Sequence, residues 1–141
     1  MLNLEYIAGF FDGEGCVSVN GRGYLSVLVN GLKCEQVLEE LESMFGGSVS
    51  TRSSGIHTWT ITTRKAQKFL QTILPYLIIK EDVARMGIEL ADTPKGDKKN
   101  EIWWEIHELN LRTSPHAANK GRFKTIEDVS ELQSEEGAVT T

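Results

Sequence analysis

The chain has 141 residues, 40% of them hydrophobic and 25% charged, a composition that fits one globular domain with its own core. No apolar run reaches the length of about 18 residues that a membrane span needs, and the first residues lack the basic and apolar regions of a secretion signal. We therefore expect an intracellular protein, either cytoplasmic or organellar, that is not secreted and whose two cysteines, Cys16 and Cys34, stay reduced.

The net charge of −5 argues at first sight against a nucleic-acid partner, but the charges are unevenly distributed. All 15 lysines and arginines lie at or before Lys124, whereas five of the 20 acids follow it. Residues 1–124 therefore hold fifteen acids and fifteen bases and are neutral overall. A basic face can exist on such a domain despite an acidic tail.

Apolar periodicity predicts a helix, a hairpin, a second helix, a second hairpin and then further helices. The expected elements are a helix at 3–13, strands at 16–20 and 24–29, a helix at 34–45, strands at 48–52 and 56–62, and helices at 64–74, 81–91, 100–111 and 125–134. Because helices and antiparallel strands segregate, the fold class is α+β, with one face of a four-stranded antiparallel sheet covered by helices. We expect one domain over 1–124 and an acidic helix and tail over 125–141. Trp103 and Trp104 are expected in the core, from their helical spacing.

The first predicted helix ends in a run of two acids and three glycines that reads IAGFFDGEG, residues 7–15. An EF-hand loop starting at Asp12 is excluded, because Val17 stands where the sharp-turn glycine is needed and Gly23 where the last glutamate is needed. A phosphate-binding loop is excluded because no strand precedes the run and the Lys-Ser/Thr pair is missing. Acids that merely solvate a helix end remain an alternative. A carboxylate at a helix C-terminus opposes the macrodipole, however, which favours a specific role such as holding a cation.

These nine residues resemble the signature of the LAGLIDADG homing endonucleases, with Glu14 in place of the more usual aspartate. The predicted element order also matches the αββαββα core of that family, over residues from about 3 to 92. The resemblance implies a site-specific endonuclease that makes double-strand breaks in a long pseudo-palindromic DNA site by metal-assisted phosphodiester hydrolysis. The single copy of the signature implies a homodimer, and the family implies an intron- or intein-associated origin.

The resemblance assigns Glu14 as the ligand of Mg²⁺, assisted by the backbone carbonyl of Gly13. Gly9 and Gly13 lie four residues apart on one helical face, so two such helices can approach closely. A two-fold axis there would bring the two copies of Glu14 together, a setting that needs a hard cation. The expected dimer interface comprises Ala8, Gly9, Asp12 and Gly13. For Asp12 a structural role, as a cap or a hydrogen-bond partner, is the favoured interpretation.

Three further residues are candidates for the catalytic site. Lys80 ends the segment LPYLIIK, residues 74–80, which resembles the family's Pro-aromatic-Leu-x-x-Lys segment and implies a lysine that stabilises charge at the scissile phosphate. Asn30 corresponds to a polar residue that orders the catalytic water, although Asn30-Gly31 is equally typical of a plain turn. Lys33 is a weaker candidate for the family's nearby basic group, because the expected position holds Cys34.

Double-stranded DNA is the expected partner, bound by the open face of the sheet, because antiparallel strands can enter the major groove and read base edges. Alternation against Val17, Val49 and Trp59 selects the side chains that point away from the core. They are Ser18, Asn20, Arg22, Ser50, Arg52, Thr58 and Thr60. Phosphate contacts are expected from Lys33, Lys65, Lys68, Lys80 and the basic stretch 112–124. An ordinary solvated sheet face is the alternative, and neither a membrane nor a small-molecule cofactor is expected.

Two rival functions remain open. One is a non-cleaving nucleic-acid-binding protein on the same fold, such as an intron maturase or a regulator, which the neutral charge and Cys34 favour. The other is a plain protein-interaction domain, which would be supported by a DNA-binding curve that shows no dependence on salt. Glu14 and Lys80 favour the endonuclease over both.

Overall fold

The computed structural model describes residues 2–113, so the predicted helix at 125–134, the acidic tail and nearly all of the basic stretch 112–124 lie outside the described residues. The elements are α1 (Leu4–Glu14), β1 (Gly15–Val19), β2 (Leu25–Gly31), α2 (Glu35–Phe45), β3 (Ser48–Thr51), β4 (His57–Thr62), α3 (Thr63–Ile73), the 3-10 helix η1 (Leu74–Tyr76), α4 (Glu81–Asp92) and α5 (Asp97–Thr113). The predicted order and the α+β class are confirmed. None of the described helices is both long and apolar enough to cross a membrane.

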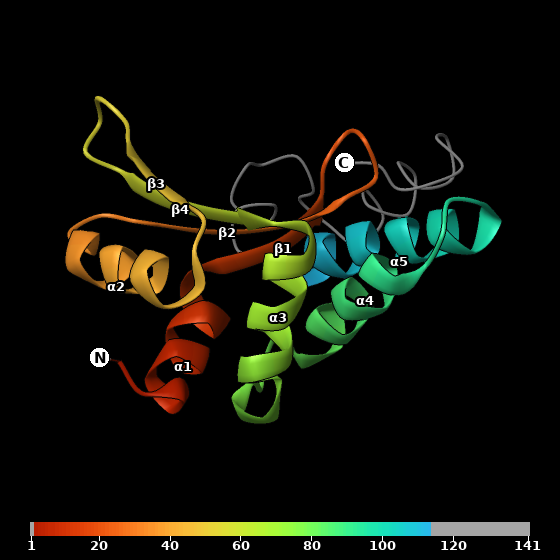
Figure 1. Ribbon diagram of the computed structural model, residues 1–141, viewed down its shortest axis with the longest axis horizontal. Helices are drawn as coiled ribbons and strands as arrows, with labels where there is room; N and C mark the ends of the chain where they lie inside the picture. Colours follow the sequence, from red (N-terminus) through yellow and green to blue (C-terminus); the bar gives the residue numbers. More distant parts are fainter. Residues whose placement is uncertain (1, 114–141) are drawn as a thin grey trace.

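The four strands form one antiparallel sheet in the order β1-β2-β4-β3, so the two hairpins pair through β2 and β4 at its centre. Helices α1, α2 and α3 lie on one side of this sheet, and α4 and α5 continue along it beyond β1 (Figure 1). The tips of both hairpins project to the other side of the molecule (Figure 1). The sheet therefore has a covered face and an open face, as the sequence predicts.

The pairing register assigns the β2 side chains, which the sequence left ambiguous. Val27 pairs with Val17 on β1 and Ile61 on β4, and side chains directly opposite one another share a face. All three are buried, so this row faces the helices. Ser26, Leu28 and Asn30 therefore point to the open face.

The core between sheet and helices is built around an aromatic cluster. The ring of Phe69 on α3 meets Phe11, Phe45 and Trp59 edge-on, at centroid distances of 5.5, 4.8 and 5.0 Å. The indole N–H of Trp59 donates a hydrogen bond to the Gly46 carbonyl, 2.8 Å away, so this buried donor is satisfied. The cluster locks α1, α2 and α3 to one another and to β4.

The two C-terminal helices pack beside β1. Gly87 brings α4 close to the sheet, since a Cβ there would sit 3.0 Å from both Leu25 and Val17. The Asn110 amide donates to the Val17 carbonyl at 2.7 Å and so covers part of the exposed edge of β1. The expectation that both tryptophans are core residues is wrong for Trp104, whereas Trp103 packs against the core from its edge. Ile102 and Ile106 fill that role, while Trp103 is half-buried and Trp104 is 42% exposed.

Candidate functional site

Glu14 lies at the junction where α1 passes directly into β1. The Asn3 side chain caps the start of α1 by accepting from the Tyr6 N–H at 2.7 Å, and Gly15 begins the strand immediately after Glu14. Any side chain at residue 15 would collide with the Phe11 ring, so this junction needs glycine. The exposed Glu14 carboxylate is thus held between a packed helix and a paired strand.

Asp12 joins the end of α1 to the segment that carries Lys80. Its carboxylate accepts hydrogen bonds from the backbone N–H groups of Ile78 and Lys80, both at 2.9 Å. The ammonium group of Lys80 in turn donates to the Asp12 carbonyl at 2.6 Å. These three bonds hold the segment 78–80 against Asp12, which lies two residues before Glu14 at the end of α1. They give Asp12 the structural role that was expected from the sequence.

Both cysteines lie beside these groups. Burial raises the pKa of the Cys34 thiol, and the negative charge of the nearby Glu14 carboxylate raises it further. Burial also raises the pKa of the Cys16 thiol, and the Lys80 ammonium partly opposes that effect. Cys34 is therefore a neutral thiol next to Glu14, and it supplies no positive charge where the family pattern expects a basic group.

Asn30 lies in β2 and is not part of a turn. Asn30 follows Val29, which pairs with Gly15, so Asn30 lies at the end of the sheet where α1 ends with Glu14. The Asn30 side-chain oxygen accepts from the Thr58 hydroxyl at 2.7 Å, which fixes the orientation of the amide group. The structure thus brings Asn30, Glu14 and Lys80 to one end of the sheet.

The open face carries three cross-strand rows of side chains. From the end nearest Glu14 they are Asn30–Thr58–Ser50, then Cys16–Leu28–Thr60–Ser48, then Ser18–Ser26–Thr62. The sequence-predicted DNA residues Ser18, Ser50, Thr58 and Thr60 all belong to these rows, although Thr58 is only 6% exposed. The other members of the rows were not predicted, although extending the alternation of β1 by one residue identifies Cys16.

The remaining predicted DNA residues lie at the hairpin tips. Arg22 and Arg52 are exposed in the β1–β2 and β3–β4 turns. Asn20 is committed to the first turn, because its side-chain oxygen accepts from the N–H groups of Arg22 and Tyr24 at 2.9 and 3.0 Å. Lys33 is exposed in the loop before α2, in a left-handed backbone conformation with φ of 57°.

Two of the lysines proposed for phosphate contacts do not belong to this surface. Lys65 and Lys68 are on α3, which covers the opposite face of the sheet (Figure 1). The other basic residues proposed for this role, Lys120, Arg122 and Lys124, lie outside the described residues.

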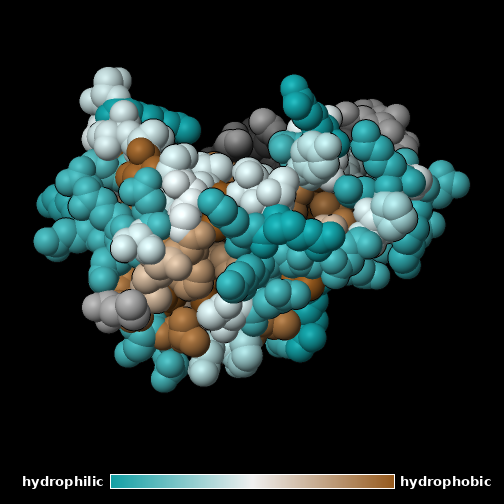
Figure 2. Space-filling model, in the orientation of Figure 1, coloured by the Kyte–Doolittle hydropathy of each residue, from teal (hydrophilic) through white to brown (hydrophobic). Residues whose placement is uncertain are grey.

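An apolar surface surrounds the exposed side of α1. Gly9 and Gly13 are exposed, and a Cβ at either would meet nothing within 4 Å. Tyr6, 48% exposed, stacks on Phe10 along the same side. Ile78 and Ile79 on the segment anchored by Asp12 are 84% and 62% exposed. Figure 2 shows hydrophobic atoms gathered over α1 and between α1 and α3.

One member of the predicted dimer interface needs correction. The Ala8 side chain is completely buried in the chain's own core, so it is closed to any partner. Asp12 is half-buried and bonded to Ile78 and Lys80. Gly9 and Gly13 remain open to a partner, because this side of α1 has no layer of the described fold above it.

One chain by itself offers few metal ligands at this point. Within residues 2–113, no three His, Cys, Asp or Glu side chains converge in a way that could hold a metal ion. Glu14 and the Gly13 carbonyl are hard oxygen donors of the kind that Mg²⁺ prefers, while the Asp12 carboxylate is already engaged. Within residues 2–113, Glu14 and the Gly13 carbonyl are therefore the oxygen donors open to an ion at this helix end.

No model of a known protein family matches the sequence, and no protein of curated function matches it significantly. The fold, however, matches solved structures. The homing endonuclease I-CvuI, solved in complex with its target, superimposes with a TM-score of 0.61 at 21% identity, over 97% of this chain and 96% of its own. An archaeal intron-encoded homing endonuclease, I-Vdi141I, gives 0.53 at 19% identity over 77% of this chain and 96% of its own.

The LAGLIDADG homing endonuclease I-SmaMI, bound to cleaved DNA, gives a TM-score of 0.58 at 21% identity. The match covers 79% of this chain but only 48% of I-SmaMI. At these identities the similarities establish a shared fold.

Proposed function

We propose that this chain, which has the LAGLIDADG homing endonuclease fold, is a homodimeric endonuclease that cuts both strands of a long pseudo-palindromic DNA site. The observation that carries the proposal is the arrangement at the end of α1. There an exposed carboxylate, Glu14, and Lys80, which is held to Asp12 by two hydrogen bonds, lie at one end of an open polar sheet face. I-CvuI and I-Vdi141I, described as homing endonucleases in complex with DNA, have the same fold.

The dimer is supported by the apolar side of α1 and by the incomplete ligand set. Two α1 helices packed through Gly9 and Gly13 would bury the apolar surface around Tyr6, Ile78 and Ile79, which are 48%, 84% and 62% exposed. A two-fold axis there would bring two Glu14 carboxylates together and supply the ligands that one chain lacks. The match covers 96% of I-CvuI but only 48% of I-SmaMI, so this chain spans about half the length of I-SmaMI.

The residues fit Mg²⁺, with Glu14 and the Gly13 carbonyl as ligands from each chain. A bound divalent ion would polarise the phosphodiester and lower the pKa of a water molecule. Charge stabilisation and the positioning of water are assigned to residues of the chain itself. Lys80 presents a positive charge to the phosphate oxygens as the phosphorus is attacked. Asn30, whose carbonyl is taken by Thr58, keeps its amide N–H groups free to orient a water molecule opposite Glu14.

Glu14→Gln tests the proposal directly, because it removes the ligand charge and leaves the side chain's size unchanged. The variant should bind DNA with an affinity close to that of the wild type and should cut no detectable plasmid carrying the intronless target in Mg²⁺. Glu42→Gln, an exposed glutamate on α2, is the matched control and should cut normally. Cutting by the Glu14 variant, or cutting by the wild type in excess EDTA, would refute the assigned role.

A non-cleaving DNA-binding protein on this fold is the second candidate. It is favoured by one observation, the neutral Cys34 thiol beside Glu14 where the family pattern has a basic group. The same assay separates the two functions: salt-dependent binding of the target without nicking in Mg²⁺ would support this candidate.

A further inference from the structure

An open groove lies between the tip of the first hairpin and the corner that joins α4 to α5. It measures about 520 Å³ and is lined by residues of three segments. Its lining residues are Val19, Asn20, Gly21, Arg22, Gly23, Leu90, Lys95, Gly96, Lys99, Asn100 and Trp103. The groove reaches the β1–β2 turn and shares no lining residue with the Glu14 site.

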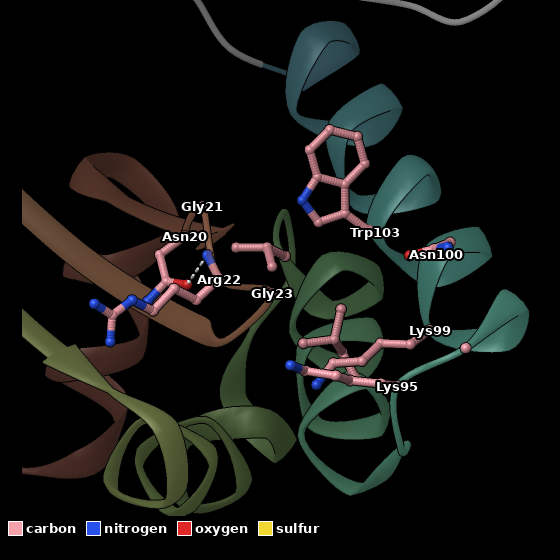
Figure 3. A pocket seen from close by; sticks show the side chains of 11 residues that line it. Asn20, Gly21, Arg22, Gly23, Lys95, Lys99, Asn100 and Trp103 are labelled. Carbon is pink, nitrogen blue, oxygen red and sulfur yellow. Dashed lines mark hydrogen bonds between the residues drawn. The ribbon is translucent and has the colours of Figure 1, made fainter.

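The charges in this groove have one sign. Arg22, Lys95 and Lys99 line it, and no aspartate or glutamate does. In Figure 3 the side chains of Lys95 and Lys99 extend from the α4–α5 corner towards the hairpin, whereas the guanidinium of Arg22 points away from them. The groove therefore presents two ammonium groups inside and one guanidinium at its rim, which is an attractive surface for an anion.

Several side chains of the groove are held in place by their neighbours, and its volume of about 520 Å³ has room for a large anion. The Lys99 ammonium lies 5.7 Å from the centre of the Tyr24 ring, a cation–π contact that holds it between this groove and a smaller neighbouring hollow. Trp103 faces the groove (Figure 3) and is supported from behind by His107, stacked at 4.6 Å. Gly96, just before α5, and Asn100, in its first turn, complete this side of the groove, and the Asn100 N–H donates to the Gly96 carbonyl at 3.1 Å.

We propose that this groove binds the phosphodiester backbone of the duplex that lies on the sheet, beyond the part that the strands contact. The inference rests on the proposed function. Seven residues of extended chain lead from Gly15 to Arg22, a distance of at most about 23 Å at 3.3 Å per residue. At 3.4 Å per base pair, the groove meets the backbone no more than about seven base pairs from the scissile phosphate.

The test compares salt dependence among variants of the full chain. Lys95→Gln/Lys99→Gln removes both ammonium groups, Lys65→Gln/Lys68→Gln removes the same charge from the opposite face, and Lys95→Arg/Lys99→Arg keeps the charge. Binding of a mixed-sequence DNA duplex several helical turns long is measured by fluorescence anisotropy over a range of salt concentrations. The slope of log K against log salt is negative, and each lost phosphate contact should bring it closer to zero by about 0.9.

In the proposed homodimer the Lys95→Gln/Lys99→Gln variant loses four ammonium groups, so we expect its salt dependence to be less steep by about 3.6, with the α3 control and the arginine variant close to the wild type. Melting temperatures of all variants report on the fold. A wild-type slope in the glutamine variant, or an equal loss in the α3 control, would overturn this inference while DNA binding itself survives. Failure of the wild type to bind any duplex would overturn the proposed function and this inference with it.

Free nucleotides offer the same phosphate chemistry, and a separate measurement distinguishes them. Quenching of tryptophan fluorescence is titrated with a nucleoside monophosphate. Quenching that Lys95→Gln/Lys99→Gln abolishes, together with an unchanged DNA slope, would mean that the groove takes a free nucleotide and would overturn the assignment to the duplex.

Discussion

The two ends of the sheet are built differently. At the α1 end, short bonds from Asp12 to Ile78 and Lys80 and the loop-free junction at Gly15 fix the functional groups. At the hairpin end, the long side chains of Lys95 and Lys99 extend from the corner between α4 and α5 into an open groove. A site that stabilises a transition state needs fixed geometry, whereas phosphate contacts need charge more than they need position. Single substitutions at the α1 end should therefore cause large losses of cleavage, whereas each charge removed at the hairpin end should weaken DNA binding by a small step.

The largest effect is expected from Gly9→Leu at the α1 end. The chain itself has room for this side chain, because nothing lies within 4 Å of a Cβ at residue 9, and leucine is the better helix former. The isolated fold should therefore persist, while the packing of two α1 helices is blocked and cleavage is lost. Sedimentation should give half the mass of the wild type. Ser43→Leu on the exposed side of α2 is the control, and an unchanged mass for Gly9→Leu would remove α1 from the interface.

Lys80→Met comes next. It keeps the length of the side chain and removes the charge, so single-turnover cleavage should slow by about 10²- to 10³-fold with little change in DNA affinity. Lys68→Met on α3 should cut at the wild-type rate. If Lys80→Met weakens binding and leaves the rate of the bound complex intact, Lys80 is a phosphate anchor and not a catalytic group.

Asp12→Asn should have a smaller, mixed effect. The amide offers one acceptor oxygen where the carboxylate offers two, so one backbone N–H at residues 78–80 loses its partner, at a cost of about 1–2 kcal/mol in the free energy of unfolding. Cleavage should fall about tenfold because Lys80 is less well positioned.

The double variant Asp12→Asn/Lys80→Met shows whether the two residues act as one unit. It should cut no more slowly than Lys80→Met alone, since the two act through one group. Additive losses would show that Asp12 has a role independent of Lys80. Asp82→Asn, a nearby exposed aspartate, is the control for the lost charge.

The smallest effect concerns Cys34. Because the Glu14 carboxylate helps to raise the pKa of the Cys34 thiol, Glu14→Gln should lower that pKa and speed alkylation by iodoacetamide at a fixed alkaline pH. The measurement is the pH dependence of alkylation in a Cys16→Ser background, with Glu39→Gln as the control. Equal profiles for Glu14→Gln and the parent would separate Cys34 from the site.

The fold could be predicted because the pattern of apolar residues within each short segment identifies the helix or strand that it forms. Alternation in β1 and β4 and the apolar spacing in α1 to α3 each show which face is buried. In β2, apolar residues occupy both faces, and only the pairing of Val27 with Val17 and Ile61 identified Leu28 as outward-facing. Ala8 was misplaced for a related reason: a small residue beside Gly9 fits either a core or a helix interface.

The site was only partly predictable, because its bonds join residues far apart in sequence. The family resemblance indicated Glu14, Lys80 and Asn30, but nothing local links Asp12 to Ile78 or Lys80, more than 60 residues away. The groove also escaped sequence analysis. Lys95 and Lys99 look like ordinary solvated lysines until the β1–β2 turn is placed opposite them.

The absence of a loop between α1 and β1 has a further consequence. Gly15 directly follows Glu14, and the Phe11 ring packs where a side chain at residue 15 would lie. We therefore expect α1 and β1 to move together as one rigid body. In a dimer joined through α1, the crossing angle of the two helices would then fix the angle between the two sheets. The spacing between the half-sites would be set by that angle, so a target of different length would require a repacked helix pair, whereas new base preferences would need only new side chains on the strands.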